Sequence, residues 1–113
     1  AYDRLPSIYA AADVKVIASD ERESFCFAAL EAMAMGLPLV STACGMLPSL
    51  IGGNEGGRVV AVDDAAGFAK ALVAMAADAD ERRRAGRRNR DYVIANHSWQ
   101  NSARKLRDLY ELL

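Results

Sequence analysis

The chain has 113 residues, a formal net charge of −1 and a hydrophobic content of 52%, which suffices for one modest domain with a packed core. The nearly balanced charge excludes a general attraction to nucleic acid or to an anionic membrane surface. No apolar run approaches the roughly 20 residues that a membrane-spanning helix needs.

The cysteine content and the first residues indicate the setting of the chain. Cys26 and Cys44 are the two cysteines, and without a secretory signal we expect free, buried thiols in a cytoplasmic protein. Association of the intact protein with the inner face of a membrane stays open. The chain does not begin with Met and opens directly on structured-looking sequence, so we expect a fragment of a longer protein.

The first predicted elements are a helix and a strand. Helical spacing recurs in the first apolar residues, which are Leu5, Ile8, Tyr9 and Ala12. This spacing predicts a short helix that ends near residues 12–13, with Asp3 as its N-cap. Residues 14–18 form a β-branched run that is apolar except for Lys15, which predicts a strand covered on both faces in a parallel sheet.

A second helix and a second strand are expected after a polar loop at residues 19–24. Residues 25–35 are apolar on nearly every side, which predicts a buried helix. Gly36 is the expected C-terminal stop of this helix. Residues 37–42 then predict a strand, with Pro38 near its start, where proline is tolerated.

Turn residues dominate the next segment of the chain. Residues 44–49 predict a loop that leads into a single helical turn at residues 48–51, and the glycines of residues 52–57 predict a tight turn. Residues 58–62 predict a third strand.

Helices are predicted for the rest of the chain. Asp63 and Asp64 precede a helix whose apolar face is formed by Phe68, Ala69, Leu72, Val73 and Ala76. A charged helix is expected over residues 80–95, and Ser98 is the expected cap of the last helix. The last helix carries an apolar stripe formed by Trp99, Ala103, Leu106, Tyr110 and Leu113.

Strands that alternate with helices predict an α/β fold with a parallel sheet and right-handed crossovers. A doubly wound sheet has about five or six strands, so three strands predict a partial Rossmann-like sheet with flanking helices and a C-terminal helical extension. We expect residues 1–113 to form a single partial domain.

Two carboxylates, Glu23 and Glu31, bracket an apolar segment of seven residues. Glu23 is expected in the loop before the second helix and Glu31 about two turns into it. In an open α/β sheet, ligands bind outside the carboxyl ends of the strands, and the start of a helix favours a phosphate or diphosphate. A carboxylate on an apolar helix needs hydrogen bonds, which a pair of vicinal sugar hydroxyls would supply. Alternatively, Glu31 pairs with a Lys or Arg, and Glu23 is solvated surface or a charge that stabilises the start of the helix.

Residues 23–40, which read ESFCFAALEAMAMGLPLV, resemble the E-x7-E signature of retaining glycosyltransferases of family four, whose fold is GT-B. Residues 5–13, 57–63 and 96–99 resemble the segments that flank this signature in the family. The resemblance covers essentially the whole chain. It implies the second half of the C-terminal, donor-binding domain of a GT-B enzyme, without the acceptor domain.

The resemblance also implies roles for particular residues. It assigns to the donor site Glu23, Ser24, Phe25, Cys26, Phe27, Glu31 and Gly45. Glu31 would bind the ribose hydroxyls of the nucleotide, and Glu23 would act in catalysis by contacting the transferred sugar. Backbone N–H groups at the start of the helix would hold the sugar or diphosphate, and Gly45 would lie near the donor. Neither a metal nor another cofactor is implied.

Other reactive or charged residues have simpler interpretations. His97 is the single histidine, and we expect a structural or surface role rather than general-base catalysis. Cys26 is expected to be a packed thiol rather than a nucleophile, because no histidine partner is at hand. The arginines of residues 82–84 and 87–88 could contact nucleic acid or an anionic lipid, but the interspersed acids favour a solvated helix face.

The predicted function is transfer of a sugar from a nucleoside-diphosphate sugar to an acceptor, with this chain supplying part of the donor site. The expected partners are the nucleotide sugar and the missing acceptor domain or its equivalent chain, and nucleic acid is not an expected partner. We expect the chain alone to be inactive. The alternative is a non-catalytic nucleotide-binding or structural partner module with the same fold.

Overall fold

The computed structural model describes residues 4–20, 26–52 and 55–112. In this part of the chain the elements follow one another as α1 (Leu5–Ala10), β1 (Lys15–Ile17), α2 (Phe27–Ala34), β2 (Leu39–Thr42), α3 (Leu47–Gly52), β3 (Gly57–Val60), α4 (Ala65–Ala77), α5 (Ala79–Asn96) and α6 (Trp99–Glu111). The three strands are parallel and lie in the order β1-β2-β3. The predicted α/β fold with a partial parallel sheet is therefore confirmed.

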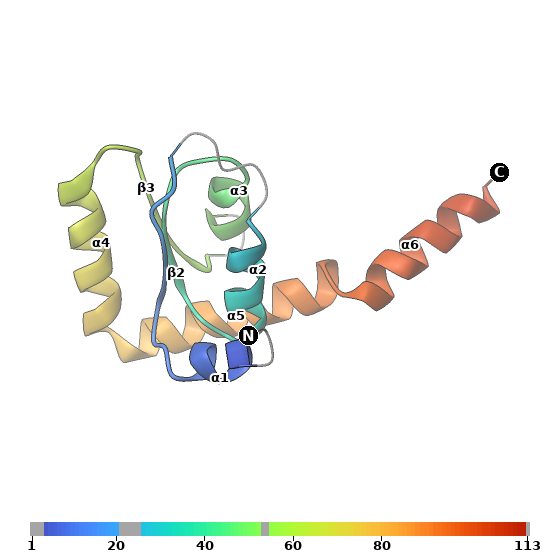
Figure 1. Ribbon diagram of the computed structural model, residues 1–113, viewed down its shortest axis with the longest axis horizontal. Coiled ribbons are helices and arrows are strands. Elements are labelled where there is room, and N and C mark those ends of the chain that lie inside the picture. Colours follow the sequence, from blue (N-terminus) through green and yellow to red (C-terminus); the bar gives the residue numbers. More distant parts are fainter. Residues whose placement is uncertain (1–3, 21–25, 53–54, 113) are drawn as a thin grey trace.

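The sheet is covered on both faces at its central strand, β2. Figure 1 shows α2 and α3 on one side of the sheet and α4 on the other. Side chains alternate along a strand, and accordingly Leu39 joins the apolar core that includes Met33 and Leu47, whereas Val40 joins the core that includes Met75. Every residue of β2 is buried, because both faces of this strand are packed against helices.

Strand β1 differs from the prediction. It pairs with β2 on one side and is an edge strand of the sheet that the structure describes. Ile17 is buried, but Val16 is 42% exposed and Lys15 is half-buried. The prediction of a strand covered on both faces is wrong for these residues, because α2 covers one face of β1 and α4 packs on β2 and β3 instead.

Helix α2 is also less enclosed than its composition indicates. It begins at Phe27, with Cys26 as N-cap, and its first residue is 70% exposed. Ala29, Ala32 and Met33 are buried and form the side that packs inward. The prediction of a helix buried on nearly every side is therefore wrong at Phe27, which lies where the helix emerges from the core.

The C-terminal stop of α2 is confirmed. Gly36 has a φ of +77°, and the N–H group of Leu37 donates to the Ala32 carbonyl at 3.0 Å. The N–H group of Gly36 donates to the Met33 carbonyl, also at 3.0 Å. This pair of hydrogen bonds is a Schellman motif, in which a left-handed glycine ends the helix without the steric cost of a Cβ atom.

Some element boundaries shift by a few residues. Helix α1 ends at Ala10 rather than near residue 12, and Asp3 lies outside the described residues. The α3 segment is longer than the single turn that was expected, and β2 begins after Pro38. The Pro38 carbonyl nevertheless accepts a hydrogen bond from the Lys15 N–H group at 2.9 Å, so proline stands just before the ladder, where its missing N–H group costs nothing.

The two caps that the sequence predicts for later helices are present. The Asp64 carboxylate accepts a hydrogen bond from the Gly67 N–H group at 2.9 Å at the start of α4. The Ser98 hydroxyl oxygen accepts one from the Asn101 N–H group at 3.1 Å at the start of α6. Each cap satisfies a donor that the first helical turn leaves without an intrahelical partner.

Helix α5 closes the amino-terminal edge of the sheet (Figure 1). Its Asn89 side chain is fully buried and donates to the Leu37 carbonyl at 2.8 Å and the Gly56 carbonyl at 2.7 Å. These carbonyls belong to the segments that lead into β2 and β3. One amide group therefore fixes the entry of both strands.

Helix α6 projects away from the rest of the molecule, as the orange and red segment of Figure 1 shows. Its apolar residues are exposed, with Trp99 at 89% and Tyr110 at 67%. In the part of the chain that the structure describes, no helix combines the length and apolar character needed to cross a membrane.

Candidate functional site

Glu31 lies on α2 and faces α1. Its side chain is half-buried, and the hydroxyl group of Tyr9 donates to its Oε2 atom at 3.1 Å. Among the described residues, no Lys or Arg forms an ion pair with Glu31. The alternative in which a basic side chain neutralises Glu31 is therefore not what these residues show, and a neutral hydroxyl holds one carboxylate oxygen instead.

A pocket of about 290 Å³ opens beside this carboxylate, between α1 and α2. It is lined by Leu5, Pro6, Tyr9, Glu31, Ala34 and Met35. The lining is mostly apolar, with the tyrosine hydroxyl and the carboxylate as its side-chain polar groups. Such a combination suits a ligand with a flat apolar part and a few hydroxyl groups.

Tyr9 is the site residue that sequence reasoning did not identify. In the sequence it was only one position of a helical pattern, and Glu31, the partner of its hydroxyl group, lies 22 residues further along the chain. The Lys15 ammonium lies 5.5 Å from the centre of the Tyr9 ring, within the range of a cation–π interaction. Burial raises the pKa of Tyr9, and the hydrogen bond to Glu31, the Glu31 charge and Cys26 raise it further. Tyr9 is therefore a hydrogen-bond donor at neutral pH.

The start of α2 carries several of the predicted donor-site residues. Cys26 is buried at the N-cap, with an extended backbone and no hydrogen bond from its side chain to the first turn. Phe27 is the first helical residue and is largely exposed. Glu23, Ser24 and Phe25 lie outside the described residues.

The carboxyl ends of β1 and β2 are joined by side-chain hydrogen bonds that the sequence analysis did not predict. The Thr42 hydroxyl donates to the Ser19 carbonyl at 2.6 Å, and the Cys44 thiol donates to the Asp20 carbonyl at 2.6 Å. These contacts anchor the segment that leads toward Glu23. Both cysteines are free and buried, as predicted.

Gly45 follows β2 at the carboxyl edge of the sheet. It is exposed and has a φ of +57°, a left-handed conformation that glycine adopts without strain. The structure thus places Gly45 at the edge where ligands of open α/β sheets bind. Its role toward a donor remains a prediction.

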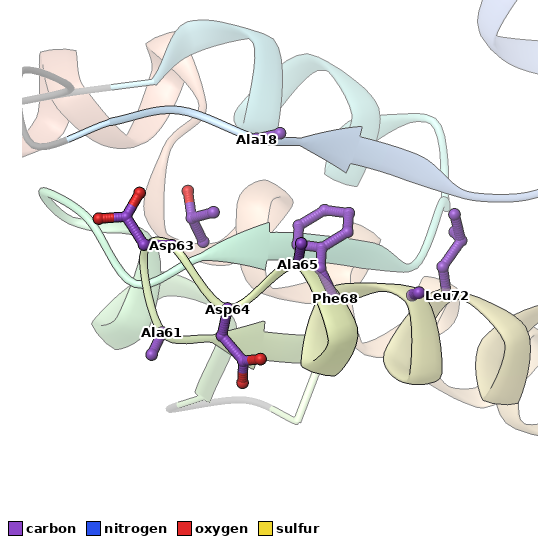
Figure 2. Close-up of a pocket in the computed structure, with 9 residues that line it drawn as sticks. Ala18, Ala61, Asp63, Asp64, Ala65, Phe68 and Leu72 are labelled. Atoms are coloured by element: carbon purple, nitrogen blue, oxygen red, sulfur yellow. The ribbon is translucent and has the colours of Figure 1, made fainter.

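A larger pocket, of about 600 Å³, lies between α4 and the sheet. Figure 2 shows the Phe68 and Leu72 side chains pointing from α4 toward the sheet and Ala18 across from them. The charged groups of its lining are the carboxylates of Asp63 and Asp64, and Asp64 already caps α4. The smaller pocket is the better candidate for a ligand with hydroxyl groups, because its Glu31 carboxylate lies beside the Tyr9 hydroxyl and an apolar wall.

His97 and the arginines of α5, the other reactive or charged residues considered above, contact neighbouring side chains of the chain itself. The His97 ring packs against Tyr92, with ring centres 5.3 Å apart. On α5, Arg83 pairs with Asp80, and Arg84 pairs with Glu81 at 3.1 Å. Within the described ranges, no group of three or more His, Cys, Asp or Glu side chains is arranged to hold a metal ion.

The sequence of the chain is similar to those of known proteins. Residues 1–78 match the protein family described as "Glycosyl transferases group 1". A D-inositol 3-phosphate glycosyltransferase from Corynebacterium kroppenstedtii is 40% identical over 107 residues, which cover 95% of this chain and 23% of that protein. The protein of the same name from Corynebacterium jeikeium is 39% identical, over 98% of this chain and 26% of its own length.

A solved structure is also similar to the chain. Sucrose-phosphate synthase from Thermosynechococcus elongatus aligns with a TM-score of 0.83 and 34% identity, over 93% of this chain and 26% of that protein. The chain therefore spans about a quarter of the length of these relatives. The resemblance of the fold to a GT-B enzyme is confirmed, and the chain belongs to the glycosyl transferases group 1 family.

Proposed function

We propose that this chain supplies part of the donor site of a glycosyltransferase that moves a sugar from a nucleoside diphosphate to an acceptor, with retention of anomeric configuration. The observation that carries the proposal is the Glu31 carboxylate, which accepts a hydrogen bond from Tyr9 in the lining of the pocket between α1 and α2. A half-buried carboxylate with no ion pair among the described residues suits a ligand rich in hydroxyl groups, because hydroxyls supply the hydrogen bonds that it needs.

The direction of α2 supports a particular placement of the nucleotide. Glu31 follows the first helical residue, Phe27, by four positions, or about 6 Å along the helix axis. A nucleoside diphosphate laid along α2, with its phosphates at the positive end of the helix dipole, would bring its ribose to Glu31. Its base would then reach the apolar pocket between α1 and α2.

The other donor-site residues would act near the diphosphate and the sugar. Glu23 would contact hydroxyl groups of the transferred sugar, and backbone N–H groups from Ser24 to Phe27, with Gly45 nearby, would line the diphosphate. Preorganised N–H groups stabilise the charge that develops on a departing diphosphate. The helix start and basic side chains of the whole protein would neutralise this charge without a metal ion.

The acceptor site would belong to another part of the intact protein, because the chain spans about a quarter of its relatives. The partners are then a nucleotide sugar and an acceptor-binding domain, with no role for nucleic acid. The predicted cytoplasmic location and peripheral membrane association belong to the same proposal. The chain alone would be inactive, and sugar transfer by the purified chain would contradict this division of the site.

The donor-site role is tested by titrating the isotopically labelled chain with UDP, GDP and ADP and following backbone amide signals by NMR. We expect at least one nucleotide to bind and to shift signals of α1 and α2. Glu31→Ala should weaken this binding about tenfold or more, because hydrogen bonds to a charged group are lost. Glu111→Ala, which removes an exposed carboxylate on α6, is the matched control.

Binding that is unchanged in Glu31→Ala would overturn the assigned role. Binding without catalysis distinguishes the second candidate function, a non-catalytic nucleotide-binding or structural module, which the short span of the chain also allows. For that question, the intact protein is assayed for sugar transfer with and without Glu23→Gln. Loss of turnover with retained nucleotide affinity supports the enzyme, whereas no turnover by the unmutated intact protein supports the binding module.

A further inference from the structure

We propose that Tyr9 is a positioning residue for nucleotide binding, which fixes the Glu31 carboxylate so that its other oxygen, Oε1, meets the ribose diol. This inference rests on the proposed function and deepens it. It starts from one contact, the hydrogen bond from the Tyr9 hydroxyl to Glu31 Oε2 at 3.1 Å.

The contact joins two elements that the sequence does not connect directly. Tyr9 lies on α1 and Glu31 on α2, and β1 runs between them in the chain. Both side chains are half-buried and line the same pocket. The hydrogen bond therefore ties the orientation of the carboxylate to the opposite wall of the pocket.

The chemistry of a carboxylate explains why such a tie matters. The terminal torsion of a glutamate is broad, so an unrestrained carboxylate samples many orientations. A hydroxyl group on Oε2 removes much of this freedom, while Oε1 and the second lone pair of Oε2 still accept hydrogen bonds. Binding of a ligand then costs less side-chain entropy, because the Glu31 carboxylate is already ordered.

Two features keep Tyr9 in its position and in its donor form. The Lys15 ammonium, 5.5 Å from the ring centre, stabilises the ring on the side of β1. The raised pKa of Tyr9 keeps the hydroxyl protonated through the neutral range. The same hydroxyl would be lost as a donor only under strongly alkaline conditions.

The simpler interpretation is that Tyr9 only packs α1 against α2. Tyr9→Phe separates the two interpretations, because it keeps the ring and its packing but removes the donor. Tyr92→Phe is the matched control, since it removes the hydroxyl of a half-buried tyrosine that packs against His97 instead.

The experiment uses whichever of UDP, GDP and ADP binds the chain most tightly, together with the 2′,3′-dideoxy form of that nucleotide. We expect Tyr9→Phe to weaken binding of the natural nucleotide about three- to tenfold, the effect of one hydrogen bond. Binding of the dideoxy form should not change, because it has no diol to present to Glu31. Tyr92→Phe should change neither affinity.

Equal losses for both ligands, or no loss for either, would show that Tyr9 does not position Glu31 and would overturn the inference alone. Failure of the proposed function has a different result. In that case no nucleotide binds the unmutated chain, or Glu31→Ala binds as well as the unmutated chain, and the inference falls together with the site.

Discussion

A Cβ atom added to Gly86 would stand 1.9 Å from the carbonyl oxygen of Gly36. Gly86 lies in the middle of α5, and Gly36 ends α2, so the two glycines allow the backbones of these segments to touch. No side chain fits between them. This contact brings α5 under the amino-terminal edge of the sheet, where Asn89 on the same helix reaches its two carbonyl partners.

Gly86→Ala should therefore destabilise the fold although alanine is the better helix former. Overpacking against a backbone atom costs about 1–3 kcal/mol, and we expect a net loss of that order in the free energy of unfolding by urea. Gly52→Ala is the control, because a Cβ atom at Gly52 would meet nothing within 4 Å. Equal stability of the two variants would show that α5 can move away without cost.

Asn89→Ala should be among the more damaging single changes in α5. It removes the side-chain donor of the buried Leu37 carbonyl, and an unsatisfied buried group costs about 1–3 kcal/mol. It also removes one of the hydrogen bonds to the Gly56 carbonyl, which keeps the one from the Leu39 N–H group. Denaturant unfolding measures the loss. Asn96→Ala on the same helix also removes an amide donor, but an exposed one, and should stay within about 0.5 kcal/mol of the unmutated chain.

The pH dependence of Tyr9 follows from its raised pKa. Since the folded chain holds this proton more tightly than the unfolded chain, the contribution to stability is full below about pH 10 and is lost as pH rises through the folded-state pKa. Spectroscopic titration should therefore show one tyrosine that ionises at a higher pH than an ordinary tyrosine. Tyr9→Phe should remove this high-pH step from the titration curve. If the high-pH step instead disappears in Tyr92→Phe, its assignment to Tyr9 is wrong.

The exposure of two large apolar residues predicts a small loss of stability for one substitution and a large loss for the other. Trp99 is 89% exposed on α6, and Trp99→Ala should change the unfolding free energy by no more than about 0.5 kcal/mol. Met75 is fully buried on α4, and Met75→Ala should cost about 2–5 kcal/mol. Thermal unfolding compares the two variants directly. A large loss in Trp99→Ala would indicate that α6 packs on the molecule in solution.

The hydrophobic pattern was enough to predict the elements and their order. Alternating strands and helices predicted a parallel sheet, and local chemistry predicted the end of α2 at Gly36 and the caps at Asp64 and Ser98. These features depend on residues within a few positions of one another. Local hydrogen bonds and backbone sterics decide them wherever the element lies in the fold.

The candidate site could be predicted only in part. The spacing of Glu23 and Glu31 and the family resemblance identified a carboxylate that needs hydrogen bonds, and the structure shows one such bond to Glu31, from a side chain of the chain itself. That partner, Tyr9, could not be found from spacing, because the contact depends on how α1 packs against α2. The roles of Glu23 and of the start of α2 toward a donor remain predictions.

The pattern of apolar residues along the sequence by itself determined that this chain folds as an α/β domain with a helix carrying Glu31, because burial of periodic apolar faces permits few arrangements. Tertiary structure alone decided which apolar residues are covered, as the exposure of Phe27, Val16 and Trp99 shows. It also decided that Gly86 and Asn89 of a charged helix would be central to packing. Burial and long-range hydrogen bonds depend on which surfaces meet in space, and the spacing of residues along the chain does not show which surfaces these are.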